Sequence, residues 1–221
     1  MGAQTKACIA AVKSRGLAAA GRTPRWLAMT FNDRTTPLTL LQTRRSGKPR
    51  DLAGPGPSPE QLDQMVAIAA RTPDHGKLAP WRFVIVPDEA RPALALKLVE
   101  ILRAEKPDAT ARDEEAAAQF ATQAPSLVVV LSAPVQPHKV PLWEQELSAG
   151  AACMNLLHAA HAMGFAGGWL TGWPAYSDAV RDLFGTEGQR IAGFVFLGTP
   201  SRPLEERPRG ELSQLVHRWN P

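Results

Sequence analysis

The sequence predicts an α+β fold in which a small sheet is sandwiched among helices. Helical segments dominate, and the three runs with strand character are short and far apart. No repeat or domain linker interrupts the 221 residues, which are enough for one sizeable core. No stretch approaches the roughly 20 apolar residues of a membrane span. We therefore expect one globular domain without a membrane segment.

The first 35 residues differ in composition from the rest of the chain. They are basic, and no acidic residue precedes Asp33. A transit-type peptide would explain this, and so would an upstream start codon with Met29 as the true first residue. No apolar stretch typical of a secretory signal is present. We expect residues 1–35 to be a mobile arm and residues 36–221 to form the domain.

The first part of the domain alternates loop and helix signals. Residues 36–43 form a short apolar segment, and residues 47–59 are a loop rich in Gly and Pro. Ser58, with Pro59 and Gln61 after it, is typical of a capped helix start. Pro73 disfavours helical geometry in the residue before it, so this helix should end near Arg71.

Three apolar runs predict strands, and three further segments predict helices. The strand candidates are residues 81–86, 127–132 and 192–197. The helix candidates are residues 91–104, 108–121 and 177–184.

The longest predicted helix covers residues 143–163. No charged residue occurs between Ser148 and Met163. A helix that is apolar all round belongs in a core or an interface, and the many small residues here allow a close approach. The tail, residues 200–221, ends in apolar residues, so we expect it to wrap around this subunit or a partner.

Charge and cysteine content limit the function classes. The net charge of +4 favours an anionic ligand. The basic residues are scattered without interleaved aromatics, which argues against nucleic-acid binding. The two cysteines form no pattern of a disulfide framework, so the cytoplasm is the expected compartment.

Arg44-Arg45-Ser46 is the first candidate binding motif. By itself, an arginine pair before a Gly/Pro loop is more often a solvated basic corner. Alternatively, the guanidinium forks and the serine hydroxyl hold a phosphate and a ring carbonyl.

Two further motifs follow in the chain. The motif Arg71-Thr72-Pro73-Asp74-His75 lies at the end of a helix, where cations complement the helix dipole. Alternatively, it points Arg71 and His75 at a ligand. The segment 167–172 (GGWLTG) is a tight turn after the long helix, or its glycines let the backbone approach a flat ligand beside Trp169.

Other catalytic patterns lack support. His158 and His161 lie three apart on a helix but have no second ligand pair, so core or interface positions are favoured over a metal site. Glu144 and Glu146 should point to different faces of their helix. Nucleophile-elbow, P-loop and dinucleotide-fold signatures are missing from the sequence.

Taken in order, these motifs resemble the nitroreductase family of FMN flavoproteins, and most closely its compact bacterial branch. The resemblance covers roughly residues 43–221. The matching segments are Arg44-Arg45-Ser46, Glu60-Gln61-Leu62, Arg71 to His75 with Pro80 to Phe83, His138 to Pro141 with Trp143 to Gly150, Gly167-Gly168-Trp169, and Gly193 to Pro200.

The resemblance implies a three-layer α/β/α sandwich around a mostly antiparallel sheet, in an intertwined homodimer with FMN at the interface. It assigns Arg44, Arg45 and Ser46 to the phosphate and ring edge, and Arg207 or Arg209 to a further phosphate contact. It places Arg71 against FMN as well, and His75 in the site, from this subunit or the second one. It also implies that Trp169, Leu170 and Thr171 line the other side of FMN. Leu170 departs from the pattern, because the branch commonly has arginine there.

The implied activity is ping-pong oxidation of NAD(P)H with transfer to a nitroaromatic, quinone or activated alkene. No catalytic side chain and no metal are implied, since hydride transfer takes place at the flavin N5. A dehalogenating or flavin-consuming relative, a non-catalytic flavin- or nucleotide-binding module, and a nucleic-acid binder remain alternatives.

Overall fold

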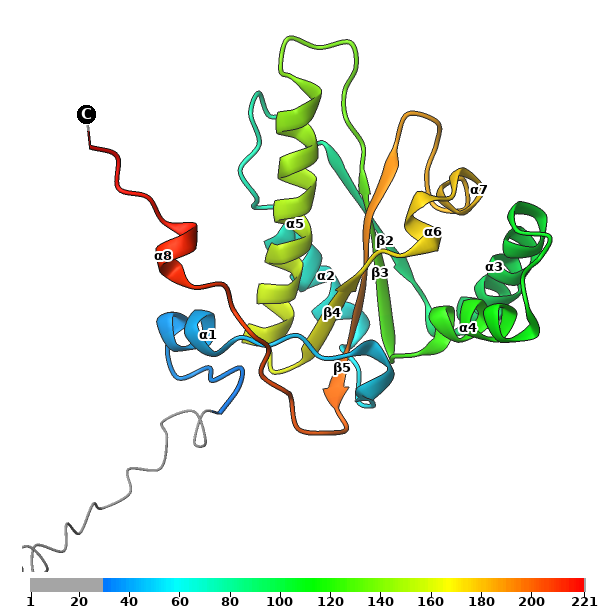
Figure 1. Cartoon of the computed structure of the whole chain (residues 1–221), viewed down its shortest axis with the longest axis horizontal. Helices are drawn as coiled ribbons and strands as arrows, with labels where there is room; N and C mark the ends of the chain where they lie inside the picture. The colour runs from blue at the N-terminus through cyan, green and yellow to red at the C-terminus, as the bar shows by residue number, and fades with distance from the viewer. Residues whose placement is uncertain (1–29, 221) are drawn as a thin grey trace, which may run out of the picture. The chain divides into compact units, whose positions relative to one another are not determined.

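The computed structural model describes residues 30–220 (Figure 1). Residues 1–29, which make up most of the predicted N-terminal arm, lie outside the described residues. The transit-peptide and start-codon explanations both concern those residues. Phe31–Pro221 form one compact unit. The last residues predicted for the arm belong to this unit: Asn32 Oδ1 accepts a 2.8 Å hydrogen bond from the Arg45 amide, and the Arg34 guanidinium lies against Gly164.

The described chain contains α-helices, β-strands and two short 3₁₀ helices, Pro49–Asp51 and Asp88–Ala90. The helices are α1 (Pro37–Thr43), α2 (Pro59–Ala69), α3 (Arg91–Glu105), α4 (Ala111–Thr122), α5 (Leu142–Ala162), α6 (Trp173–Tyr176), α7 (Asp178–Arg181) and α8 (Leu212–Leu215). The strands are β1 (Leu52–Ala53), β2 (Trp81–Val86), β3 (Ser126–Ser132), β4 (Ala166–Leu170) and β5 (Arg190–Pro200).

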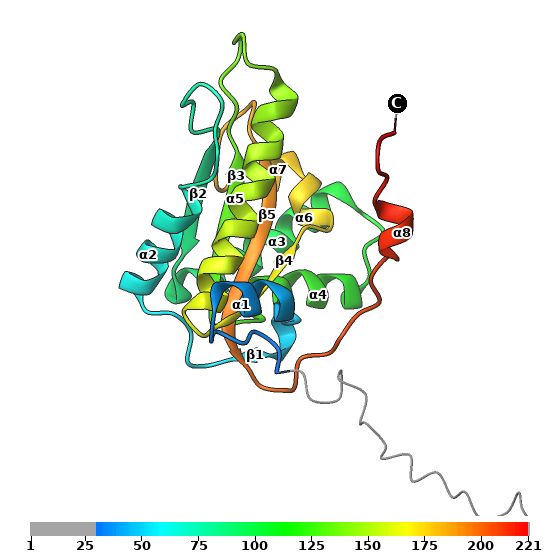
Figure 2. The same cartoon turned by 90° about the vertical axis from the view of Figure 1, so that its left-hand side faces the viewer.

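The sheet is antiparallel and lies between two helical layers. Its order is β1-β5-β3-β2, and β4 also pairs with β5. Alternate residues of β3 enter two separate cores. Leu127, Val129 and Leu131 pack in the core that contains α3 and α4, whereas Val128 and Val130 pack against α2 and α5 (Figures 1 and 2). The predicted α+β sandwich is confirmed.

The three predicted strands are confirmed, but β1 and β4 were not predicted. The turn expected over residues 167–172 is wrong for its first part, since Gly167 to Leu170 lie in β4. Two adjacent glycines carry no side-chain signal for a strand. The apolar segment 36–43 contains α1, which Thr36 caps through its hydroxyl, and the capping box at Ser58 and Gln61 is present as predicted.

Helix α5 crosses one face of the sheet. One side packs on the sheet through Cys153, Leu156 and other residues of its charge-free stretch. Near its N-terminal end, α5 exposes Leu142, Trp143 and Leu147. No helix among residues 30–220 has the length and apolarity needed to cross a membrane.

The tail has two parts. Residues 202–207 line a pocket described below, and the remainder leaves the domain (Figure 2). The apolar residues at its end are exposed rather than wrapped around their own domain: Leu212, Leu215, Val216 and Trp219.

His161 gives α5 a pH-sensitive position. It is fully buried, and neither ring nitrogen has a hydrogen-bond partner in the described structure. Burial, with smaller contributions from the charges of Arg44 and His158, lowers the pKa of His161 from 6.5 to about 3. As pH falls, the unfolded state therefore binds this proton first.

The free energy of unfolding should consequently decrease as pH falls from 6.5 towards about 3, and this contribution should be fully present above pH 6.5. His161→Leu should have a shallower pH dependence in that window. Urea unfolding of both proteins across the window measures this, and equal slopes would contradict the assignment.

Candidate functional site

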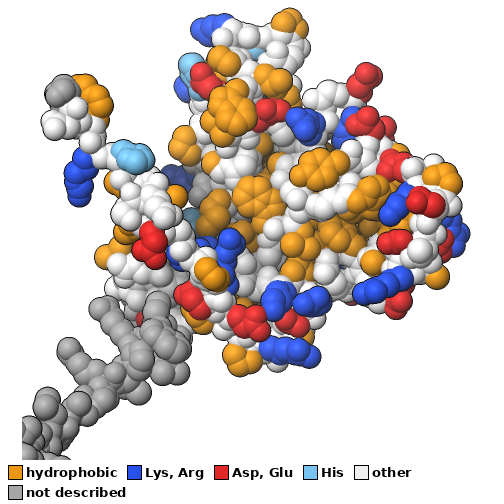
Figure 3. All heavy atoms as spheres, viewed as in Figure 1, with side chains coloured by type: hydrophobic (Ala, Val, Ile, Leu, Met, Phe, Trp, Pro, Cys, Tyr) orange, Lys and Arg blue, Asp and Glu red, His pale blue; other side chains and the backbone are white. Residues whose placement is uncertain are grey.

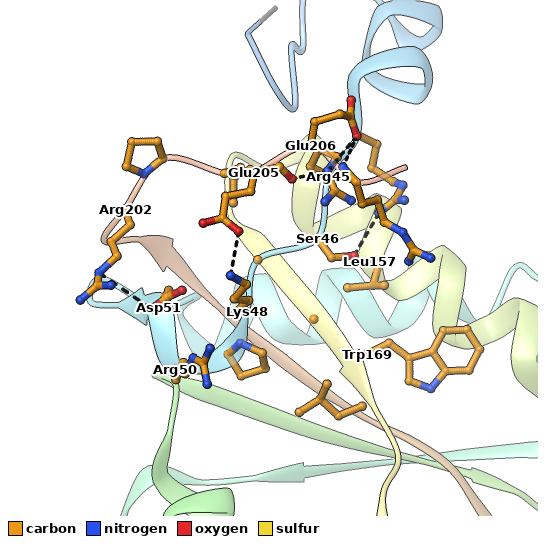
Figure 4. A pocket seen from close by; sticks show the side chains of 18 of the residues that line it. Arg45, Ser46, Lys48, Arg50, Asp51, Leu157, Trp169, Arg202, Glu205 and Glu206 are labelled. Carbon is orange, nitrogen blue, oxygen red and sulfur yellow. Dashed lines mark hydrogen bonds and ion pairs between the residues drawn. The ribbon is translucent and has the colours of Figure 1, made fainter. Parts of the chain in front are cut away.

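A cleft of about 820 Å³ lies where four segments meet. Its walls come from residues 44–51, β4, α5 and the tail segment 202–207 (Figure 4). Figure 3 shows basic side chains, with acidic ones among them, near the lower edge of this face and hydrophobic side chains at its centre. The cleft thus combines a cationic part with an apolar part.

The cationic part is built around Arg44 and Arg45. Arg45 is only 8% exposed, and its Nε donates a 2.6 Å hydrogen bond to the Glu205 carbonyl. Arg44 donates to Ser46 Oγ at 3.3 Å. Burial lowers the pKa of Arg44, and the neighbouring charges of Arg209, Arg45 and Arg207 lower it further. Crowded, desolvated guanidiniums of this kind are stabilised by an anion.

The apolar part consists of Met154 and Leu157 from α5 and Trp169 and Leu170 from β4. Trp169 lies across Gly193, and its Nε1 donates a 3.0 Å hydrogen bond to the Ala192 carbonyl. This bond fixes the indole while 38% of the residue stays exposed. A planar apolar group fits against such a wall.

Close backbone packing joins the two parts. The Gly47 amide donates to the Gly167 carbonyl at 3.0 Å. A Cβ at Gly168 would lie 2.6 Å from the Gly47 carbonyl oxygen and 3.1 Å from the Pro49 ring. The glycine at 168 is therefore required by contact between protein segments, whereas the sequence suggested close approach to a ligand.

Five of the eight predicted site residues meet in this cleft: Arg44, Arg45, Ser46, Trp169 and Leu170. Of the two tail candidates, Arg207 lines the cleft. Arg209 contacts Glu206, with 3.8 Å between Nη2 and the carboxylate.

The other three predicted residues lie elsewhere in this chain. Thr171 is exposed just beyond the end of β4 and does not line the cleft. Arg71 lines a separate hollow with Asp74, Lys77 and Trp81. His75 is exposed and its Nδ1 is 2.7 Å from Glu144 Oε2. Glu146 instead pairs with Arg190, so the two carboxylates point apart as predicted.

Several charged residues that face one another across the cleft were not among the predicted site residues. Lys48, Arg50 and Asp51 follow the predicted Arg44-Arg45-Ser46 motif, and Arg202, Glu205 and Glu206 come from the tail. The only signal was a complementary charge pattern in two segments about 150 residues apart. Without knowledge of the β1–β5 pairing, this pattern could not be recognised.

Metal and thiol chemistry find little support in the described residues. No group of three His, Cys, Asp or Glu side chains there is arranged to hold a metal ion. Burial raises the pKa of the Cys153 thiol to about 12, so it stays protonated and unreactive at neutral pH.

Comparisons with known proteins assign the sequence and the fold to the same protein family. The sequence model described as "Nitroreductase family" matches residues 41–199. The chain belongs to the nitroreductase family. It is 40% identical over 164 residues to "Putative NAD(P)H nitroreductase YdjA" of Escherichia coli (strain K12), a match that covers 74% of this chain and 87% of YdjA.

Solved nitroreductase-like structures have the same fold. A nitroreductase-like family protein from Bacillus cereus superposes with a TM-score of 0.70 at 21% identity, covering 87% of this chain and 99% of the other. The NADPH:FMN oxidoreductase from Vibrio harveyi, solved with NAD+, has a TM-score of 0.60 at 20% identity, covering 79% of this chain and 73% of the other.

Gly193→Ala should displace the indole that forms the wall in this nitroreductase family member. An added Cβ would overlap Trp169 Nε1, so the ring must rotate and lose its bond to Ala192. We expect a red shift of tryptophan emission and a stability loss of about 1 kcal/mol. Gly150→Ala is the matched control, because its Cβ would make only an ordinary 3.9 Å contact with Trp169. Identical emission from both variants would contradict this position of the indole.

Proposed function

We propose that the protein is an FMN-dependent oxidoreductase that passes electrons from NAD(P)H to a nitroaromatic, quinone or activated-alkene acceptor. The observation that carries the proposal is the cleft itself, in which crowded guanidiniums adjoin an apolar wall. FMN has matching chemistry, because it joins a phosphate dianion to a flat tricyclic ring. The family match and the name of the Escherichia coli relative support this activity.

Different residues of the cleft would bind the phosphate and the ring of FMN. Arg44 and Arg45 would hold the phosphate, with Ser46 at the ring edge and Arg207 as a further cation. Trp169 and Leu170 would form the apolar wall beside the ring. Thr171 lies beyond the end of β4, so its assigned contact requires it to reach in from the rim.

The chain supplies binding and orientation rather than an acid–base pair. The three carboxylates that line the cleft are all engaged in ion pairs: Asp51, Glu205 and Glu206. Bound FMN would supply the centre that accepts and donates hydride. The open cleft lets the nicotinamide leave before the acceptor binds, which suits ping-pong turnover in the cytoplasm.

We also propose that the active form is a homodimer. Apolar surface is exposed on α5, at Leu142, Trp143 and Leu147, and at the end of the tail. Covering this surface in a dimer would remove it from water and stabilise the assembly. In such a dimer, Arg71 and His75 would complete the partner's cleft, which explains why they lie outside this chain's own cleft. Light scattering should give twice 23.9 kDa, and a monomer with full activity would contradict the dimer.

Steady-state kinetics with NADH or NADPH and a panel of acceptors tests the activity. We expect oxidation of the nicotinamide that depends on the acceptor, with parallel lines in double-reciprocal plots. Reduction of bound flavin without turnover of any acceptor would favour the non-catalytic module. Salt-sensitive nucleic-acid binding by a flavin-free protein would favour the nucleic-acid binder.

A further inference from the structure

The first part of the tail runs alongside the segment that carries Arg44 and Arg45. Strands β1 and β5 pair antiparallel, with Leu52 opposite Pro200. The pairing continues beyond the strands, because the Ser201 amide and hydroxyl both donate to the Asp51 carbonyl at 2.9 Å. The tail therefore passes along residues 45–51 in a fixed antiparallel register.

Three ion pairs follow in that register (Figure 4). Arg202 is 3.9 Å from Asp51, Lys48 is 2.7 Å from Glu205, and Arg45 is 3.3 Å from Glu206. Each pair joins opposite charges from the two segments, and a shift by one pair would place Asp51 beside Glu205. The charge pattern thus specifies how the tail lies on the cleft.

These ion pairs differ in how much they contribute to stability. The Lys48–Glu205 pair is largely exposed, and exposed pairs contribute little to stability. The Arg45 side chain is only 10% exposed, so it has lost most of its hydration. Its Nε is directed at the tail, towards the Glu205 carbonyl and the Glu206 carboxylate. A buried guanidinium that loses such partners is strongly destabilised.

Glu206 also contacts a second cation. The same oxygen, Oε1, lies 3.3 Å from Arg45 Nε and 3.8 Å from Arg209 Nη2. The mutual repulsion of Arg44, Arg45, Arg207 and Arg209 opposes their convergence from two ends of the chain. One carboxylate between them offsets part of that repulsion.

We propose that Glu206 is a positioning residue that assembles the phosphate site of the cleft by holding Arg45 and Arg209 together. This inference rests on the proposed function. Glu206 does not touch the phosphate; its carboxylate lies 3.3 Å from Arg45 Nε, whose N–H donates to the Glu205 carbonyl, and this negative charge would hold the guanidinium in place while its terminal nitrogens face the ligand. Its effect should be confined to the phosphate end, because the apolar wall comes from α5 and β4.

Titration of the flavin-stripped full-length chain with FMN and with riboflavin tests the proposal. Riboflavin has the same ring system but no phosphate. Glu206→Gln should raise the Kd for FMN about fivefold, the upper end for an ion pair with an exposed partner, and leave the Kd for riboflavin within twofold of wild type. Glu211→Gln is the matched control, since it makes the same change in the exposed tail outside the cleft. It should alter neither Kd.

Two results for Glu206→Gln would overturn the proposal. Unchanged or tighter FMN binding would show that the carboxylate competes with the phosphate instead of positioning its ligands. An equal loss of FMN and riboflavin affinity would indicate general loosening of the cleft. Failure of the wild-type protein to bind either flavin is a separate outcome, and it would overturn the proposed function on which this inference rests.

Discussion

Arg45→Ala should weaken FMN binding by roughly 1.5–3 kcal/mol, the usual range for a hydrogen bond to a charged group. Arg45 is buried at the cationic part of the cleft, where it contacts the tail (Figure 4). Arg44→Ala should have an effect of similar size. Fluorescence titration with FMN measures both, because flavin emission changes when the ring leaves water.

Arg112→Ala provides the control for these charge removals. Arg112 is exposed on α4 and does not line the cleft. Its replacement changes the net charge equally, so it reports any long-range electrostatic effect. FMN affinities equal to wild type in both Arg44→Ala and Arg45→Ala would contradict the phosphate assignment.

Gly168→Ala should damage both the fold and the cleft. The added Cβ would lie 2.6 Å from the Gly47 carbonyl oxygen, and both groups belong to backbone that cannot rotate away. Strand β4 is held in place by its pairing with β5, where Gly168 lies opposite Phe196. The segment carrying Arg44 and Arg45 must therefore move outwards. We expect a loss of about 1–3 kcal/mol in the free energy of unfolding, together with weaker FMN binding.

Gly54→Ala makes the same change at a position where an added Cβ meets nothing within 4 Å. Urea unfolding of the two variants separates steric damage from the general effect of replacing a glycine. A Gly168→Ala protein as stable as Gly54→Ala, with normal FMN affinity, would contradict the close packing of β4 on residues 47–49.

The parts of the fold with a clear periodic pattern could be predicted from the sequence. Apolar runs predict strands β2, β3 and β5, and a capping box predicts the start of α2. Strand β4 could not be predicted, because Gly167 and Gly168 replace the side chains that define strand periodicity. Their identity depends on contacts with Gly47 and Leu197, which are distant in sequence.

The candidate site was predictable only where one segment supplies several residues. Arg44-Arg45-Ser46 and Trp169-Leu170 are such segments, and the fold brings them into one cleft. Lys48, Glu205 and Glu206 could not be found, because their roles depend on the register between β1 and β5. Arg71 and His75 stay a prediction that requires a second copy of the chain.

The absorption spectrum of the purified protein, before and after anaerobic addition of NAD(P)H, tests the central claim most directly. We expect a yellow protein with the absorption bands of bound flavin, and bleaching of those bands when NADH or NADPH is added. A colourless protein that binds no added FMN, or a bound flavin that neither nicotinamide reduces, would contradict the claim that this cleft holds FMN for hydride transfer.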